Sequence, residues 1–479
     1  MTERTSNFFL YAFAISFAAL VIAVISVWDG HSLWLAALPF AAPFAWIVVV
    51  RYPMALLASV PFIGMFKVQA ATGFSVTDPT FLIILLCGLL AGVQVLLAVT
   101  GVAKLSLRER LAGQGRPLLA YFGFAAVASA SYFYAAAPVL AQAKLQLLVV
   151  ISTLLFVAPL IFSKREEDFR QFLKAFVVLS LIVSVRTIFR VFHPDPNITD
   201  ITQIDEGQAA GIAILIMLFY DWGGGSRNRT RLLRLCLPLL GAGLLASVAR
   251  GPMLATCVGM LIGFTRVRGF RGGFKKIVIA IPIILVVAAA TIFWFHRLAG
   301  ANERFRDKKA ELQQFFSGGA ADPHASGGER IYLYRDAIRA FSQRPLLGWG
   351  IGGWSVARYG FSIGGENGAF FTNYPHNIIL EVAVEEGLPG LLAFGTLLLL
   401  LWKILCRFLH VADKKYGFLL PIGVYSVLVC MFSNDINNRL LWAWFGVILA
   451  ASRLAGTEQT PVSRLAPARA VGPLATEYL

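Results

Sequence analysis

Long apolar runs recur along the whole chain, and they restrict its possible folds more than any other feature. A helix needs about 20 apolar residues to cross the roughly 30 Å hydrocarbon core of a bilayer. Two runs, 54–66 and 252–265, are short enough to belong to tilted, re-entrant or broken helices. The runs cover residues 8–27, 33–50, 54–66, 80–100, 117–137, 145–162, 169–192, 207–222, 231–248, 252–265, 275–295, 387–405, 418–432 and 440–454. Because lipid offers no partner to an exposed peptide group, they predict an all-α polytopic membrane protein with about 12–14 transmembrane helices.

The composition excludes a water-soluble fold. Hydrophobic residues make up 58% of the 479 residues, charged residues only 14%, and the mean hydropathy is +0.71. Soluble domains carry about a quarter charged residues, so this chain has too little polar surface to cover its apolar side chains in water. The first run, 8–27, lacks a clear small-residue cleavage site, which indicates a retained helix and not a signal peptide. The five cysteines lie within apolar runs or at their ends, which favours packing roles over disulfides or a metal site.

The formal net charge of +16 indicates membrane orientation and not nucleic-acid binding. Lysine and arginine collect in cytoplasmic connectors, where anionic lipids attract them. If every run crosses, the basic connectors 104–116, 227–234, 266–276 and 403–415 lie on one side, together with both termini. An opposite connector, 193–206, has four acidic residues and no lysine or arginine. The pattern places the basic side in the cytoplasm.

One long stretch, 296–386, interrupts the succession of runs and falls on the outer side. Long loops in compact proteins are more often functional than idle. Within it, Ile331, Tyr334, Ile338 and Phe341 recur at helical spacing, which predicts an amphipathic helix on the membrane or over a cavity. The predicted organisation is N-terminal transmembrane helices in 1–200, helices carrying the Arg250 site in 201–295, a large periplasmic loop in 296–386, C-terminal transmembrane helices in 387–454 and a disordered cytoplasmic tail in 455–479.

Arg250 lies in "SVARGPM", a break between two apolar runs. An arginine at membrane depth costs roughly 2.5–3.5 kcal/mol on insertion scales and marks a function by default. The alternative is an arginine that snorkels to the interface, which is common at helix ends. Gly251 and Pro252 follow it, and they break helices and expose backbone N–H groups near a helix start, where an anion binds well.

His376 lies in "TNYPHNIILEVAVEEGLPGLLAF", just before a short acidic helix. Taken alone, a loop histidine is more often a surface or capping residue than a catalyst, and Asn377 is placed to cap the helix. A neutral imidazole is nevertheless the side chain best suited to take a proton from a hydroxyl near pH 7. Glu385 and Glu386 are expected at the membrane interface, where acids in the first turns of a helix favour its dipole.

The outer-face residues form one chemical set. Arg330 opens the amphipathic segment, and Arg186 and Arg190 share a helix face, although snorkelling explains that pair well. Arginines clamp a phosphate or pyrophosphate through charge-assisted bonds, and a histidine activates an acceptor hydroxyl. The set suggests group transfer from a lipid-linked pyrophosphate donor. The sequence has no P-loop, dinucleotide fingerprint, HExxH or Cys/His metal spacing, so we expect neither a cofactor nor a metal.

Three motifs, in order along the chain, carry a family resemblance. "ASVARGPMLA" spans 246–255, "GGERIYLYRDAIRAFSQRPLLGWGIGGW" spans 327–354, and "PHNIILEVAVEEGLPGLLAF" runs from Pro375 to Phe394. Together they resemble the signature of the O-antigen ligase superfamily, which also holds O-antigen and exopolysaccharide polymerases and some protein O-oligosaccharyltransferases. The resemblance covers roughly 205–450.

The resemblance implies roles for the residues that match its motifs. His376 would be the base that activates the acceptor hydroxyl, and Arg250 and Arg330 would hold the donor pyrophosphate. Second-rank candidates are Arg186, Arg190, Arg344 and Asp435. The family fold is an all-helical membrane bundle with a large periplasmic loop, related to the GT-C glycosyltransferases, and its members are thought to invert the anomeric centre without a metal.

The implied donor is a glycan on undecaprenyl pyrophosphate, and the implied location is the bacterial inner membrane with the active site facing the periplasm. A ligase would use lipid A–core as acceptor, whereas a polymerase would extend a second lipid-linked glycan. The motifs do not separate these two enzymes, and ligase is the prediction. A polytopic transporter or lipid flippase is the alternative of another class, but transporters place ionisable groups near the bilayer midplane and show matching broken helices in two halves.

Overall fold

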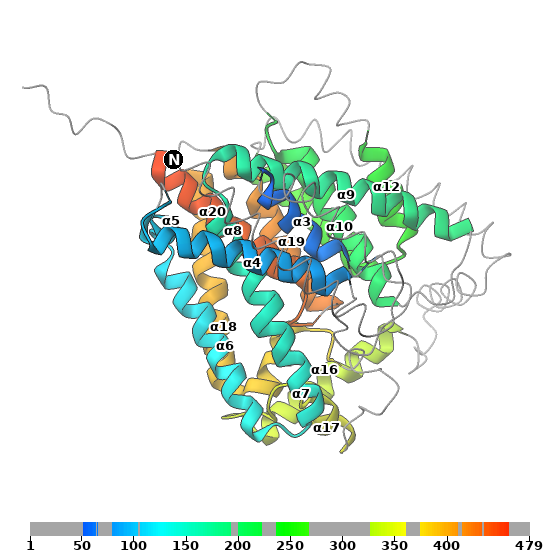
Figure 1. Ribbon diagram of the computed structural model, residues 1–479. Coiled ribbons are helices and arrows are strands. Elements are labelled where there is room, and N and C mark those ends of the chain that lie inside the picture. The colour runs from blue at the N-terminus through cyan, green and yellow to red at the C-terminus, as the bar shows by residue number, and fades with distance from the viewer. Residues whose placement is uncertain are drawn as a thin grey trace, which may run out of the picture.

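The computed structural model describes residues 51–63, 65, 79–103, 106–192, 200–222, 236–267, 326–360, 374–410, 414–433 and 435–458. These residues form helices and connecting turns with no strand among them (Figure 1). The predicted all-α fold class is therefore confirmed for the part of the chain that the structure describes. The predicted runs 8–27, 33–50 and 275–295 lie outside the described residues.

Four stretches among the described residues are long and apolar enough to cross a membrane. They are Gly115–Tyr134 (α6, Gly115–Ser131, with η3, Tyr132–Tyr134), Pro138–Phe162 (α7, Pro138–Gln146; η4, Leu147–Ser152; α8, Thr153–Phe162), Glu166–Arg190 within α9 (Glu166–Phe192) and Ile378–Leu409 within α18 (Ile378–His410). Each overlaps a predicted run, but the second begins at Pro138 and not at 145, and α18 begins at Ile378 and not at 387. The predicted short acidic helix is the first part of α18, which is kinked at Gly387.

The other helices do not meet both criteria over their described residues. They are α3 (Pro53–Ile63), α4 (Pro79–Val99), α5 (Leu107–Arg110), α10 (Asp200–Phe219), α12 (Leu237–Ala246), α13 (Arg250–Ile262) with η5 (Gly263–Val267), α16 (Ser326–Gln343), α17 (Trp354–Tyr359), η6 (Lys414–Tyr416), α19 (Leu419–Phe432) and α20 (Arg439–Glu458).

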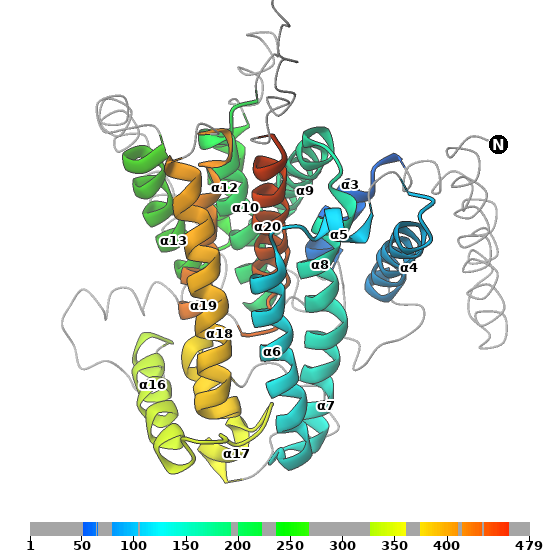
Figure 2. The same cartoon turned by 90° about the vertical axis from the view of Figure 1, so that its left-hand side faces the viewer.

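The helices differ in how far they extend along the molecule. In Figure 2, α12, α13, α19 and α20 stay in the upper part, whereas α6, α7 and α18 continue to the lower end, where α16 and α17 lie. The end of α18 and the start of α19, which flank the predicted basic connector 403–415, are at the upper end. That connector and the α16–α17 part of the predicted outer loop therefore lie at opposite ends, as the predicted topology requires.

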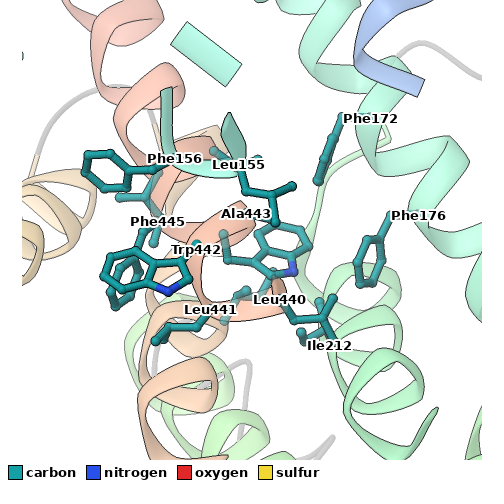
Figure 3. Close-up of a cluster of buried hydrophobic side chains, with 14 of the residues drawn as sticks. Leu155, Phe156, Phe172, Phe176, Ile212, Leu440, Leu441, Trp442, Ala443 and Phe445 are labelled. Atoms are coloured by element: carbon teal, nitrogen blue, oxygen red, sulfur yellow. The ribbon is translucent and has the colours of Figure 1, made fainter. Parts of the chain in front are cut away.

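Helix α20 forms the centre of the hydrophobic core (Figure 3). Trp442 and Trp444 on this helix are fully buried. The Trp442 ring lies 5.1 Å from the ring of Tyr121 on α6, and the Trp444 ring lies 5.2 Å from that of Phe176 on α9. Edge-on aromatic pairs of this kind add stability beyond the burial of their area. α20 thus joins the long helices to each other and fixes where the turn before Arg439 lies.

The turn between α16 and α17 packs closely against the chain segment that joins α6 to α7. Gly350 in this turn has a φ of 78°, which L-residues other than glycine rarely adopt. A Cβ at this position would lie 2.4 Å from the Ala135 Cα and 2.8 Å from the Ser131 carbonyl oxygen. Glycine is needed here both for the backbone conformation and for the close approach of two chain segments.

We expect Gly350→Ala to destabilise the protein clearly more than Gly360→Ala. Gly360 has nearly the same φ, 76°, but no atom lies within 4 Å of its Cβ position. In both variants, holding alanine in the left-handed conformation costs about 1–2 kcal/mol. In G350A the new methyl group must also push aside the backbone of the facing segment, which costs roughly a further 1–3 kcal/mol. Thermal unfolding of both variants in detergent measures the difference. Equal melting temperatures would contradict the packing described here.

Candidate active site

His376 stands immediately before α18 and has an unusual backbone. Asn377 caps the helix, because its Oδ1 accepts hydrogen bonds from the N–H groups of Ile379 at 3.0 Å and Leu380 at 3.1 Å. The predicted cap is therefore confirmed. His376 itself has a φ of 53°, and Val248, between α12 and α13, has a φ of 54°. They are the two non-glycine residues with positive φ among the described residues, and such strain concentrates at functional sites.

The turn after α19 holds the histidine in place. A hydrogen bond joins His376 to the Ser433 backbone, and the Tyr374 hydroxyl donates to the Ser433 carbonyl at 2.9 Å. The Tyr374 ring lies 4.5 Å from the imidazole, tilted by 55°. From α16, the Tyr334 hydroxyl donates to the Met431 carbonyl at 3.1 Å. The imidazole therefore lies where the start of α18, the end of α19 and α16 meet.

The surroundings of His376 favour its neutral form. Burial, and to a smaller extent the positive charge of Arg330, lower the pKa of the imidazole to about 4, although the hydrogen bond to Ser433 acts in the opposite direction. The imidazole Nδ1 is buried and has no hydrogen-bond partner among the described residues. The imidazole is therefore held in its neutral form, which is the form that can accept a proton.

Arg330 is half-buried in α16, one turn before Tyr334. The helix packs on α18 and α17 through Leu333, Ala337 and Ala340. Ile338 of the predicted apolar stripe is 59% exposed and is not part of this contact. The contact face uses alanines, which let the helices approach closely, and a pattern of large apolar residues does not include them.

Arg250 is the first residue of α13, and its helix N-terminus faces the same turn. A Cβ on Gly251 would lie 2.3 Å from the Ser433 Oγ, so this backbone touches the turn that holds His376. Ala249 at the N-cap position provides no side-chain cap. The Arg250 side chain is exposed. A helix N-terminus carries partial positive charge, and the arginine adds a full charge beside it.

Arg186 and Arg190 on α9 have partners elsewhere. Arg190 forms an ion pair with the buried Glu206, whose Oε2 also accepts from the Thr187 hydroxyl at 3.0 Å. Arg186 donates to the Met65 carbonyl. These contacts tie α9 to α10 and α3.

Arg344 and Asp435 occupy different places. The Arg344 guanidinium lies 4.1 Å over the ring of Trp349, just after the end of α16. At 1.5 Å per helical residue, it is roughly 20 Å along the helix from Arg330. Asp435 lies in the α19–α20 turn, two residues after Ser433, and desolvation raises the pKa of its carboxyl. Asp435 therefore lies in the same turn as Ser433, whereas Arg344 lies at the far end of α16.

A buried charge cluster beside this turn was missed by the sequence analysis. The Lys144 Nζ on α7 lies 2.5 Å from the Glu381 Oε1 and 2.8 Å from the Glu385 Oε2. Glu385 and Glu386 are each 1% exposed, so both side chains are buried inside the protein. The lysine neutralises acids that would otherwise be too costly to bury. The available signal was a lysine at the edge of an apolar run and two glutamates four residues apart.

Comparison with known families gives the site a context. Residues 235–395 match the model of the O-antigen ligase family. This segment is therefore similar to the O-antigen ligase family. The match confirms the predicted resemblance, although it covers about a third of the chain and is narrower than 205–450. A comparison with curated proteins found no significant match.

The matched segment contains the three first-rank candidates, Arg250, Arg330 and His376. The α19–α20 turn, which holds the histidine, lies beyond the matched segment. Lys144 lies before it. The family relationship indicates a membrane glycosyltransferase of the ligase or polymerase type acting on lipid-linked glycans.

Proposed function

We propose that this protein transfers a glycan from undecaprenyl pyrophosphate to an acceptor hydroxyl at the periplasmic face of the bacterial inner membrane. The observation that carries the proposal is the meeting of three elements at the Ser433 turn. His376 bonds to this turn, Arg330 is close enough to shift its pKa, and the N-terminus of α13 with Arg250 packs against it. A proton acceptor, an arginine close enough to shift its pKa and the N-terminus of α13 thus lie around one turn.

Each group has a role in the proposed reaction. The acceptor hydroxyl oxygen attacks the anomeric carbon, the bond from that carbon to the pyrophosphate oxygen breaks, and His376 takes the hydroxyl proton. Arg250, Arg330 and the N-terminus of α13 stabilise the negative charge that develops on the leaving pyrophosphate. Attack opposite to the leaving group inverts the anomeric centre, as the family resemblance implies. The reaction needs no metal, because the guanidinium groups supply the positive charge.

The location of the site suits a lipid-anchored donor. The site lies at the start of α18, on the side of the bundle that faces α16 and away from the predicted basic connector 403–415 (Figure 2). The predicted periplasmic loop contributes α16 and with it Arg330. A pyrophosphate at headgroup depth would reach this position while its polyprenyl chain stays in the bilayer.

The acceptor decides between ligase and polymerase, and we propose the ligase, with lipid A–core as acceptor. The test is the lipid-linked glycan pool in cells that lack the protein, sized by gel and mass spectrometry. Long chains stranded on undecaprenyl pyrophosphate, with uncapped lipid A–core, are the result expected for a ligase. Single repeat units would indicate an O-antigen or exopolysaccharide polymerase. An unaltered pool would contradict both and favour a transporter or flippase.

The pH dependence of the reaction should reflect the lowered pKa of His376. A base acts in its deprotonated form, and the pKa of about 4 places the acid limb of kcat/KM near pH 4 and not near 6.5. Arg330→Gln removes a positive charge that lowers this pKa, so the limb should move to higher pH. Arg339→Gln, an exposed arginine on the same helix, should leave the limb in place. A wild-type limb near 6.5 that R330Q does not move would contradict this role.

A further inference from the structure

Two glutamates of the buried charge cluster, Glu381 and Glu385, differ in the groups that they contact. Glu381 and Glu385 lie one helical turn apart on α18, and both contact the Lys144 Nζ. The second carboxylate oxygen of Glu381 accepts a hydrogen bond from the Ile436 N–H at 3.0 Å. Glu385 makes both of its hydrogen bonds to Lys144 and none to the turn, among the described residues. Glu381 alone of the two therefore links the lysine to the α19–α20 turn.

The turn that Glu381 holds is the turn that holds the histidine. Ile436 is three residues after Ser433, whose backbone bonds to His376 and whose carbonyl accepts the Tyr374 hydroxyl. The Ile436 carbonyl accepts from the Trp442 indole at 2.6 Å, so the far side of the turn is fixed to α20. The start of α18 is thus joined to the turn at two points, next to His376 and at Glu381.

Glu381 and Lys144 are both buried residues on helices. Glu381 has no exposed surface, and its amide donates to the Asn377 carbonyl at 2.9 Å in the first turn of the capped helix. Lys144 is 4% exposed and lies on α7, which continues into the long stretch Pro138–Phe162. The carboxylate oxygens of Glu381 and Glu385 all have hydrogen-bond partners, and such a buried network restrains the geometry of the groups that it joins.

We infer that Glu381 is a positioning residue for the transfer reaction: by joining Lys144 to the Ile436 N–H, it sets the distance between the start of α18 and the Ser433 turn, and so the orientation of the His376 imidazole. Glu381 does not touch the reacting atoms. The inference rests on the proposed function. It assigns a role in catalysis to a glutamate and a lysine that otherwise only hold helices together.

The glutamate pair provides a matched test. Glu381→Gln and Glu385→Gln each remove one negative charge next to the same lysine, but only E381Q alters the bond to the turn. With purified protein, we expect E381Q to lower kcat per folded molecule at least 3-fold and Glu381→Ala at least 10-fold. The KM for the lipid-linked donor should change less than 2-fold. The Gln variant is the milder one because its amide oxygen can still accept from the Ile436 N–H. E385Q should keep kcat within 2-fold.

Folded yield and melting temperature separate positioning from stability. A purely structural cluster would make E381Q and E385Q lose folded yield alike and leave kcat per folded molecule unchanged in both, and this outcome would overturn the inference. If E381A does not fold, the comparison of E381Q with E385Q still decides. The proposed function fails in a different way, namely when wild type itself transfers no glycan or when His376→Asn retains full transfer.

Discussion

Replacing His376 by asparagine is expected to lower glycan transfer roughly 10²- to 10⁴-fold, the range that a general base contributes. Asparagine is the suitable replacement because the residue has a φ of 53°, which asparagine tolerates and alanine does not. The asparagine side chain cannot take a proton from a hydroxyl. The measurement is kcat for transfer from a polyprenyl-pyrophosphate-linked glycan by purified H376N, with the folded fraction determined by size exclusion and thermal unfolding.

The control for this prediction is Tyr374→Phe, which removes the hydroxyl bond to Ser433 and keeps the ring against the imidazole. We expect Y374F to lose far less activity than H376N, because the base remains. Activity of folded H376N within a few-fold of wild type would contradict the assignment of His376 as the base.

The second large effect is expected at the arginines. A hydrogen bond to a charged group is worth about 1.5–3 kcal/mol, so Arg250→Gln and Arg330→Gln should each lower kcat/KM for the donor roughly 10- to 150-fold. The loss should be smaller for Arg→Lys variants at either position, since lysine keeps the charge but not the two-pronged geometry. The measurement is transfer at several donor concentrations, with acceptor in excess.

Arg339→Gln is the matched control for R330Q, because both arginines lie on α16 and Arg339 is exposed. It should keep kcat/KM within 2-fold. Equal losses in R330Q and R339Q would indicate a general effect of charge on α16 and would remove Arg330 from the proposed pyrophosphate site. If only the KM for the acceptor rose, these arginines would instead bind the acceptor.

Local sequence patterns predicted most of the helices and the cap at the site. Apolar runs located the described membrane helices because burial in lipid demands length and apolarity, which are visible in a sequence. Asn377 was recognisable as a cap because capping depends on residues within a few positions. The break at Gly387 was visible as a glycine between an acidic helix and an apolar run.

Tertiary contacts were not predictable in the same way. The buried Glu381 and Glu385 pair with Lys144, more than 200 residues away in the chain, and no local pattern encodes that pairing. The partners of His376 come from α16 and the α19–α20 turn, which are likewise distant in sequence. Motif order gave the candidates but not the fact that Arg344 lies about 20 Å along α16 from Arg330.

The measurement that tests the central claim most directly is glycan transfer by the purified protein in lipid vesicles. The substrates are a polyprenyl-pyrophosphate-linked glycan and lipid A–core, and the products are separated by gel and mass spectrometry. We predict a glycan joined to lipid A–core together with released polyprenyl pyrophosphate, and no transfer by H376N. A donor that stays intact with wild type, or a product that forms equally with H376N, would contradict the account.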